Sequence, residues 1–432
     1  MKVIEELAIL WWNKSIEEWK HYIRPRISEN TEKVVFEQLH KSLSIYDDSW
    51  IFLEFKNKFA KYHSMEYWVL YNSWTSALYA MFRAIGLSQS DEIIVPVYTF
   101  FATASPIIYT SAKIKFCDCD LSGNVDPIEL EKSITNKTKA VIVTHMRWIP
   151  CDMDKITEIC KKYNIILLED CSHAHWAEFN WKKVWSFWDI SIRSLQWQKI
   201  ITWWEWWILL TNNEELYKRA LFAGHYNKIC KQASNEKDDL FKYWLTWFWL
   251  KLRAHPLAIA IANEQFDKLD EILYQKQNYV TLIQKSLSKY SFLEFPNTKS
   301  KKPSWYALII KYNEKKANNI SIESFAKALF AEWLNEVDIP KSTGLINNLD
   351  LFYDAHKLWL SANSDIKNDN LNYENASNFY NNCIKLPVRW YADDENTVNK
   401  YIQWIEKVCW YIENKLESVS YTHLTLPTSD LV

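Results

Sequence analysis

The stretch IILLED, residues 165–170, decides the fold of this chain. Ile165–Glu169 reads as an apolar strand buried on both faces, and it ends in an acid, Asp170. From about residue 65, similar short β-rich segments alternate with helical segments. This alternation is typical of a mainly parallel sheet between crossover helices, so we predict an α/β fold. The other predicted strands are Glu92–Pro96, Lys113–Cys117, Ala140–Thr144 and Trp207–Thr211, and the predicted helices are Thr75–Ile85, Thr103–Thr110, Pro127–Ile134, Met153–Tyr163 and Glu214–Leu221.

A second, smaller unit is predicted after about residue 275. It contains a helix, a strand at Ala307–Tyr312, a helix at Ser321–Glu332 and a closing helix after Asp393. The predicted division is an N-terminal segment, 1–30, a large domain, 31–265, a small C-terminal α/β domain, 266–417, and a tail, 418–432.

Three further segments have a distinct composition. Arg253–Leu273 is long and apolar-periodic, as expected of a helix that packs in a dimer or domain interface. The Asn- and Asp-rich stretch 363–382 is predicted as a surface loop. The tail, SVSYTHLTLPTSDLV, resembles readthrough of a sequencing adapter or an assembly scar, the alternative being an ordinary disordered tail.

Charge and cysteine content exclude several classes of protein. The net charge of −2 gives no electrostatic footprint for nucleic acid or an anionic membrane. The eight cysteines form no CxxC pair, and no secretory leader is visible, so we expect reduced thiols in the cytoplasm. No run of 18 apolar residues indicates a membrane span.

The chain has 25 Trp and only 4 Gly. An average protein carries roughly 7% Gly, which is about 30 residues in a chain of this length. Several Trp stand where a turn needs Gly: Trp74 follows Asn-Ser, Trp181 follows Phe-Asn, and four Trp surround Glu205. We hypothesise that the codon UGA, which encodes Gly in some uncultured bacterial lineages, has been written as Trp. The alternative is a genuinely Trp-rich protein.

An acid and a lysine suggest a cofactor. Asp170 ends a buried strand, at the edge where parallel sheets place functional groups, and a carboxylate there needs a cationic partner. Lys199 follows about thirty residues later, just before the Trp-rich loop. A lysine that forms a Schiff base and an acid that keeps a pyridine nitrogen protonated are what pyridoxal phosphate requires. The pair alone is a weak signal.

When Gly is read in place of Trp, the segments around these residues become recognisable family motifs. Residues 72–78 become NSGTSAL, residues 169–178 become EDCSHAHGAE, and residues 194–209 become SLQGQKIITGGEGGIL. Together with IIVPVYTFFATASPI at 93–107 and CDMDKI at 151–156, they closely resemble the DegT/StrS family of nucleotide-sugar aminotransferases. The resemblance runs from about residue 7 to 416. It implies a fold-type-I enzyme that depends on pyridoxal phosphate, with a large and a small domain.

The resemblance also implies roles for single residues. Lys199 corresponds to the Schiff-base lysine, and Asp170 to the partner of the pyridine nitrogen. His173 takes the place of the residue that hydrogen-bonds the cofactor's phenolic oxygen, and Phe100 that of the ring stacked on the pyridine. The phosphate would be held by Ser73, Trp74 (as Gly), Thr75 and Ser194.

One position departs from the family pattern. Many members contribute an Asn from the partner subunit, just before an Arg, whereas this chain has Lys251-Leu-Arg253. Lys251 would then meet the phosphate as a point charge. The resemblance implies a homodimer with its site at the subunit boundary, and we expect Arg253–Leu273 to help form the interface.

The implied reaction is a ping-pong transamination from an amino acid, Glu or Gln, to a keto sugar, which we expect to be nucleotide-linked. We expect the product to serve surface polysaccharide or secondary metabolism. Lys199 would relay the proton as general acid and base. A keto-cyclitol aminotransferase and a sugar dehydratase are alternatives within the same fold, although dehydratases of the family carry His at the position of Lys199. A sugar-binding protein with Trp platforms, or a regulator without activity, are alternatives of other classes.

Other polar residues have simpler interpretations. Cys171, His173 and His175 lack a second ligand pair, so no metal site is predicted. Asp118 and Asp120 are expected in a solvated loop before a helix. For His145, at the end of a strand, lining the crevice and a structural role are both open.

Overall fold

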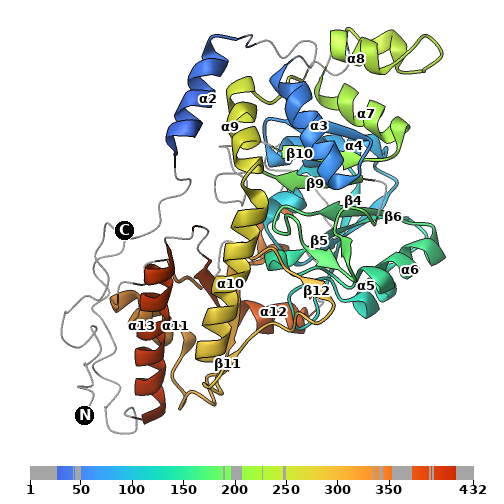
Figure 1. The fold of residues 1–432 in the computed structure, drawn as a ribbon. Helices are drawn as coiled ribbons and strands as arrows, with labels where there is room; N and C mark the ends of the chain where they lie inside the picture. The colour runs from blue at the N-terminus through green and yellow to red at the C-terminus, as the bar shows by residue number, and fades with distance from the viewer. Residues whose placement is uncertain are drawn as a thin grey trace.

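The computed structural model describes residues 27–41, 43, 50–187, 190–195, 207–225, 227–246, 250–332, 334, 336–339, 344–352, 372–388, 391 and 394–414. Figure 1 shows helices around a central sheet, with the long helix α10 (Leu269–Leu287) reaching from this body to a smaller sheet. Among the described residues, no helix is long and apolar enough to cross a membrane.

The central sheet has seven strands in the order β1-β10-β9-β6-β5-β2-β4. Neighbours from β9 to β4 pair in parallel, and only β10 runs antiparallel to its two neighbours. The mainly parallel α/β fold predicted from the sequence is confirmed. The strands are β1 (Tyr67–Tyr71), β2 (Glu92–Pro96), β4 (Lys113–Cys117), β5 (Thr138–Thr144), β6 (Ile166–Asp170), β9 (Ile190–Ser194) and β10 (Trp207–Thr211).

Helices cover both faces of this sheet because alternate strand residues point to opposite sides. On β2, Ile93 and Val95 pack in the core that includes α4 (Trp74–Ala84) and α7 (Glu214–Gly224). Ile94, between them, packs in the core of α5 (Pro127–Ser133) and α6 (Met153–Tyr163). Figure 1 shows these two pairs of helices on opposite sides of the labelled strands.

The smaller sheet has the order β11-β13-β15 and is antiparallel. Its strands are β11 (Leu293–Glu294), β13 (Ala307–Tyr312) and β15 (Cys383–Pro387), and α11 (Ile322–Ala331) and α13 (Glu395–Asn414) lie beside it (Figure 1). A separate hairpin pairs β7 (Glu178–Phe179) with β8 (Lys182–Lys183), and β12 (Lys301–Lys302) joins it. The domain boundaries themselves remain a prediction.

Three predicted elements differ in the structure. The long helix over Arg253–Leu273 is two helices, α9 (Pro256–Phe266) and α10, separated at Asp267–Lys268. The helix at Thr103–Thr110 is instead two 3₁₀ turns, Phe101–Thr103 and Ser105–Thr110. The stretch predicted as a loop contains α12 (Glu374–Asn381), and its part from 363 to 371 lies outside the described residues.

Asp118 explains how α12 is held on the large sheet. Its carboxylate accepts hydrogen bonds from the main-chain N–H groups of Asn375 and Ala376, at 3.2 and 3.0 Å. First-turn N–H groups have no acceptor within the helix, and a carboxylate suits them because negative charge is favourable at a helix N-terminus. Asp120 instead accepts from Ser122 within its own loop. The two acids therefore fix main-chain geometry and do not form a catalytic pair.

Candidate functional site

Polar side chains gather at the carboxyl edge of the parallel strands, where α/β sheets place their ligands. Asp170 ends β6 and is fully buried. Its Oδ1 accepts a hydrogen bond from the Ser172 N–H at 3.0 Å, and its Oδ2 accepts one from the Thr103 hydroxyl at 3.2 Å. Thr99 links Thr103 to Thr144, at 3.1 and 3.2 Å, so hydroxyls from the ends of two strands support this carboxylate.

The support of Asp170 by Thr103 was not predicted. Thr103 belongs to a 3₁₀ turn that follows β3 (Tyr98–Thr99), four residues after Thr99. The sequence carried a weak signal, two threonines in TFFAT, but a helix was expected there. A hydrogen-bonded, buried carboxylate that faces the sheet edge suits a protonated pyridine nitrogen, whose positive charge offsets its burial.

His173 lies in the loop after β6, three residues beyond Asp170. Its imidazole is parallel to the ring of Tyr306, with centroids 5.7 Å and planes 9° apart. Tyr306 immediately precedes β13 of the small sheet and also packs on Trp148 at 5.6 Å. The smaller unit therefore contributes an aromatic wall beside His173. No spacing in the sequence could relate two residues so far apart in the chain.

The residues predicted to hold the phosphate lie at the start of α4. Ser73 is its N-cap, and its hydroxyl accepts the Ser76 N–H at 3.1 Å and lies 3.2 Å from the Thr75 hydroxyl. Thr75 is exposed, and the first N–H groups of a helix have no partner within the helix, so this end of α4 suits an anion. Leu252 O accepts the Asn72 N–H at 2.9 Å. This contact brings the segment of Lys251, an exposed residue, beside the cradle within one chain.

Trp74, the first residue of α4, does not suit the cofactor. Its indole stacks on Phe100, with ring centroids 5.1 Å and planes 18° apart. Its buried Nε1 has no hydrogen-bond acceptor among the described residues. Phe100 is the ring predicted to stack on the pyridine, so an indole lies against the ring that is assigned to the cofactor. The residues fit pyridoxal phosphate with Gly at position 74, and they do not fit it with Trp.

His145 and Glu169 form a buried pair just behind the site. His145 Nε2 lies 3.0 Å from Glu169 Oε2, and His145 Nδ1 accepts the Cys151 N–H at 3.1 Å. Glu169 also accepts main-chain N–H groups of residues 185 and 187, at 2.8 and 3.3 Å. The ligand atoms of Cys171, His145 and Glu169 lie within 4.8 Å of one another, a spacing that could hold a single metal ion. The ring nitrogens and carboxylate oxygens already have protein partners, so the pair holds loops, and His145 has the structural role.

The remaining predicted site residues are placed only in part. Ser194 ends β9 and is buried at the same sheet edge as Asp170. Lys199 lies outside the described residues. Asp170 and Ser194 thus lie at one edge of the sheet, His173 lies in the loop after β6, and Phe100 lies against the start of α4. The roles of these residues and of Lys199 toward the cofactor stay predictions.

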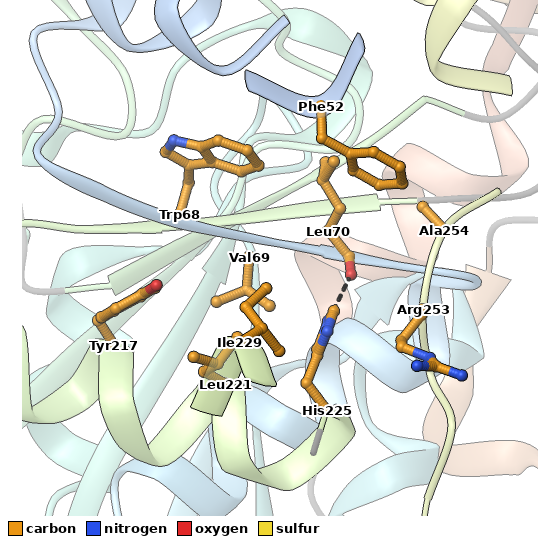
Figure 2. Close-up of a pocket in the computed structure, with 10 residues that line it drawn as sticks. All are labelled: Phe52, Trp68, Val69, Leu70, Tyr217, Leu221, His225, Ile229, Arg253 and Ala254. Carbon is orange, nitrogen blue, oxygen red and sulfur yellow. Dashed lines mark hydrogen bonds between the residues drawn. The ribbon is translucent and has the colours of Figure 1, made fainter. Parts of the chain in front are cut away.

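A small pocket lies elsewhere, at the edge strand β1 (Figure 2). The indole of Trp68 and the ring of Phe52 lie on one side of the strand, and Leu221 and His225 lie on the other. His225 Nε2 is 3.0 Å from Leu70 O. The lining is mostly apolar and includes no predicted site residue, so we assign it to packing between β1, α3 (Ile51–His63) and α7.

Two relatives show what this chain is similar to in sequence. GDP-perosamine synthase from Escherichia coli O157:H7 is 32% identical over 250 residues, 56% of this chain and 66% of that protein. An L-glutamine:3-amino-2,3-dideoxy-scyllo-inosose aminotransferase, so named only provisionally, from Micromonospora echinospora is 28% identical over 54% of each chain. This chain thus spans about half to two thirds of the length of these relatives.

The fold itself is matched over nearly the whole chain. The crystal structure of an aminotransferase from Psychrobacter cryohalolentis superposes with a TM-score of 0.77 at 20% identity, covering 91% of this chain and all of that one. The family model of the DegT/DnrJ/EryC1/StrS aminotransferases matches residues 29–402. The resemblance predicted from the motifs is confirmed. Two solved structures of a sugar aminotransferase of this fold, from Streptococcus pneumoniae, are of its PMP form and its PLP form. This chain belongs to the DegT/DnrJ/EryC1/StrS aminotransferase family.

Proposed function

We propose that this protein transfers an amino group from an amino acid, glutamate or glutamine, to a nucleotide-linked keto sugar. The observation that carries the proposal is Asp170, fully buried at the carboxyl edge of the sheet and held by Ser172 and Thr103. Bound pyridoxal phosphate supplies an electron sink beside the carbon that gains or loses the amino group. A carboxylate fixed in this place keeps the ring nitrogen protonated, which that chemistry needs.

The neighbouring side chains have distinct tasks in this proposal. Phe100 offers a ring face, and His173, backed by Tyr306, offers a ring nitrogen to the phenolic oxygen. The capped start of α4 and Ser194 supply hydroxyl and N–H donors for the phosphate. Lys199 Nζ is proposed as the nucleophile and as the group that moves the substrate proton.

The names of two relatives support different acceptors. GDP-perosamine synthase, the more similar one, acts on a GDP-linked sugar, and the relative from Micromonospora acts on a cyclitol. The higher identity favours a nucleotide-linked sugar, with the keto-cyclitol as second candidate. A place in surface polysaccharide or secondary metabolism is part of the proposal. A dehydratase is disfavoured because position 199 is Lys.

The test is an amino-transfer assay with purified protein, glutamate or glutamine, and a panel of nucleotide-linked keto sugars and keto-cyclitols. Mass spectrometry of the products shows which acceptor gains nitrogen. The proposal expects an aminated nucleotide sugar from the parent protein and none from the Lys199→Ala variant. Amination of cyclitols alone selects the second candidate. Turnover by a folded Lys199→Ala protein contradicts the assignment of the lysine.

We also propose a homodimer in the cytoplasm. The predicted interface, Arg253–Leu273, needs refinement because eight of the eleven residues of α9 are buried within this chain itself. Part of α9 is covered by α2 (Glu29–Leu39), where the Asn30 amide and the Thr31 hydroxyl donate to Glu264 at 3.2 and 3.3 Å. The interface would therefore use mainly the residues that flank α9. Sedimentation of active protein as a monomer would reject the dimer.

A further inference from the structure

Six tryptophans in the described part of the chain have a positive φ angle. Their φ angles lie between 50° and 86°, at positions 50, 148, 176, 181, 185 and 305. The other non-glycine residues with positive φ in the described part of the chain are all Asn or Ser, small polar residues that hydrogen-bond locally. Tryptophan is thus the single bulky residue type found in this conformation. Glycine adopts it without a steric penalty.

The hairpin of β7 and β8 gives the clearest case. Phe179 pairs with Lys182, so Asn180 and Trp181 form a two-residue turn. Their φ angles are 47° and 64°, both positive, as in a type I′ turn. Asn-Gly is the preferred sequence of this turn. The indole of Trp181 is 90% exposed, so it has little packing that would offset the strain.

At position 185 the surrounding protein imposes the conformation. The φ angle is 86°, and the N–H donates to buried Glu169 at 2.8 Å. Glu169 is itself fixed by His145 at 3.0 Å. Only main-chain atoms of residue 185 take part in this contact with Glu169, so glycine would keep it. If the backbone relaxed toward negative φ, the buried carboxylate of Glu169 would lose the hydrogen bond from this N–H, which is costly.

Two of the other indoles are poorly accommodated. Trp148 and Trp176 are buried, and neither Nε1 has a hydrogen-bond acceptor within the described residues. A buried indole N–H normally finds a partner, because leaving it without one is costly. At these two positions tryptophan is unfavourable for two reasons, the positive φ angle and the buried indole N–H without an acceptor.

Trp74 adds an observation that rests on the proposed function. Its indole covers Phe100 at the start of α4, and its Nε1 is also buried without an acceptor in the described structure. Gly at this position would uncover the ring face and open the first turn to a phosphate. The backbone observations at the other six positions do not depend on the reaction.

We infer that the organism that makes this protein inserts glycine at Trp50, Trp74, Trp148, Trp176, Trp181, Trp185 and Trp305, by reading one codon as glycine. The protein then has an Asn-Gly hairpin, unstrained loops behind Asp170 and an open cofactor cradle. A single change of decoding accounts for the positive φ angles at six positions, for the indole N–H groups of Trp148 and Trp176 without an acceptor in the described structure, and for the indole on Phe100. The indoles of Trp185 and Trp305 are buried with hydrogen-bond acceptors, so at these two positions the inference rests on the backbone alone.

Peptide mass spectrometry of the protein isolated from its source cells tests this directly. Trypsin releases residues 163–182 as one peptide, which contains both Trp176 and Trp181, and residues 62–83 as another, which contains Trp74. The expected masses have glycine at these positions. Tryptophan at positions 176 and 181 overturns the inference. Because the readout is mass, its failure is distinct from failure of the proposed amino transfer.

A second measurement uses recombinant protein. Trp181→Gly is expected to raise the Tm, whereas Trp410→Gly, in the interior of helix α13, is expected to lower it. If the printed chain does not fold, the Tm comparison starts from the chain with glycine at all seven positions. Tryptophan restored at 181 then lowers the Tm, and tryptophan restored at 74 weakens cofactor binding in a spectroscopic titration. An unchanged or higher Tm with tryptophan at 181 overturns the inference.

Discussion

The indole of Trp74 lies against the ring of Phe100, with centroids 5.1 Å apart and planes 18° apart. Such geometry is that of an offset aromatic stack. Phe100 is the residue that the family resemblance assigns to stacking on the cofactor. The side chain at position 74 therefore decides whether the cofactor has access to this ring.

With glycine at the other six inferred positions, glycine at position 74 is expected to bind pyridoxal phosphate about tenfold or more tightly than tryptophan there, since the cofactor no longer has to displace a stacked indole. The measurement is a titration that follows the visible absorbance of the bound cofactor. Trp404→Gly, in helix α13 and remote from the cradle, is the control and should leave the affinity unchanged. Equal affinities for the Trp74→Gly variant and its parent would show that the indole does not obstruct the site.

Asp170→Asn should retain fold and cofactor but lower turnover by about 10²-fold or more, because the neutral amide no longer keeps the ring nitrogen protonated. Tm, bound cofactor and kcat are measured on the same preparation. Turnover close to that of the parent would remove Asp170 from the chemistry.

Glu169→Gln is a matched change one residue earlier, with a different expected result. Glu169 holds His145 and the N–H groups of residues 185 and 187, so its loss should lower the free energy of unfolding by about 1–3 kcal/mol. Chemical denaturation measures this change. The folded fraction of the variant should bind the cofactor and have a kcat close to that of the parent. A stable variant with turnover reduced as much as in Asp170→Asn would reverse the two roles.

Stability should fall as the pH drops below about 6.5, the ordinary pKa of histidine, because of His63. Burial, followed by the positive charges of Arg193 and Lys183 and then His175, holds its pKa well below that value. The unfolded chain therefore binds a proton that the folded protein does not, and stability rises with pH through this window.

His63→Gln should flatten the pH dependence of the unfolding free energy between about pH 5 and 7, by up to about 1.4 kcal/mol per pH unit. Denaturation curves at several pH values measure the slope. His40→Gln, at an exposed position, serves as the control. An unchanged slope in His63→Gln would show that another group causes the loss.

Most of the large sheet could be predicted from the sequence. The bounds of β2, β4, β10, β13 and α6 are those of the predicted segments, because short apolar strands and capped amphipathic helices carry strong local signals. The break between α9 and α10 was missed, since the apolar periodicity continues across Asp267–Lys268. The antiparallel direction of β10 is a long-range property that no local pattern encodes.

The candidate site residues were named from sequence motifs and their roles stay predictions, whereas the contacts around them depend on packing. Asp170, His173 and the start of α4 were identified from short sequence motifs. Tyr306 reaches His173 from the smaller unit, and Thr103 reaches Asp170 from a turn predicted as helix. These contacts depend on tertiary structure. The excess of tryptophan predicted that some glycines had been written as tryptophan. The φ angles identify six described tryptophans whose backbone conformation favours glycine.

Side-by-side expression of two genes tests the central claim most directly, namely that this is a pyridoxal-phosphate enzyme whose backbone requires glycine. A bulky residue at positive φ costs about 1 kcal/mol or more, against a total stability of about 5–15 kcal/mol. The measurement is the visible absorbance of the soluble, purified protein before and after glutamate is added. The gene with glycine at every UGA codon should give soluble yellow protein whose absorbance changes with glutamate, and the gene with tryptophan should give aggregate. Soluble yellow protein from the tryptophan gene, together with aggregate from the glycine gene, would contradict the account.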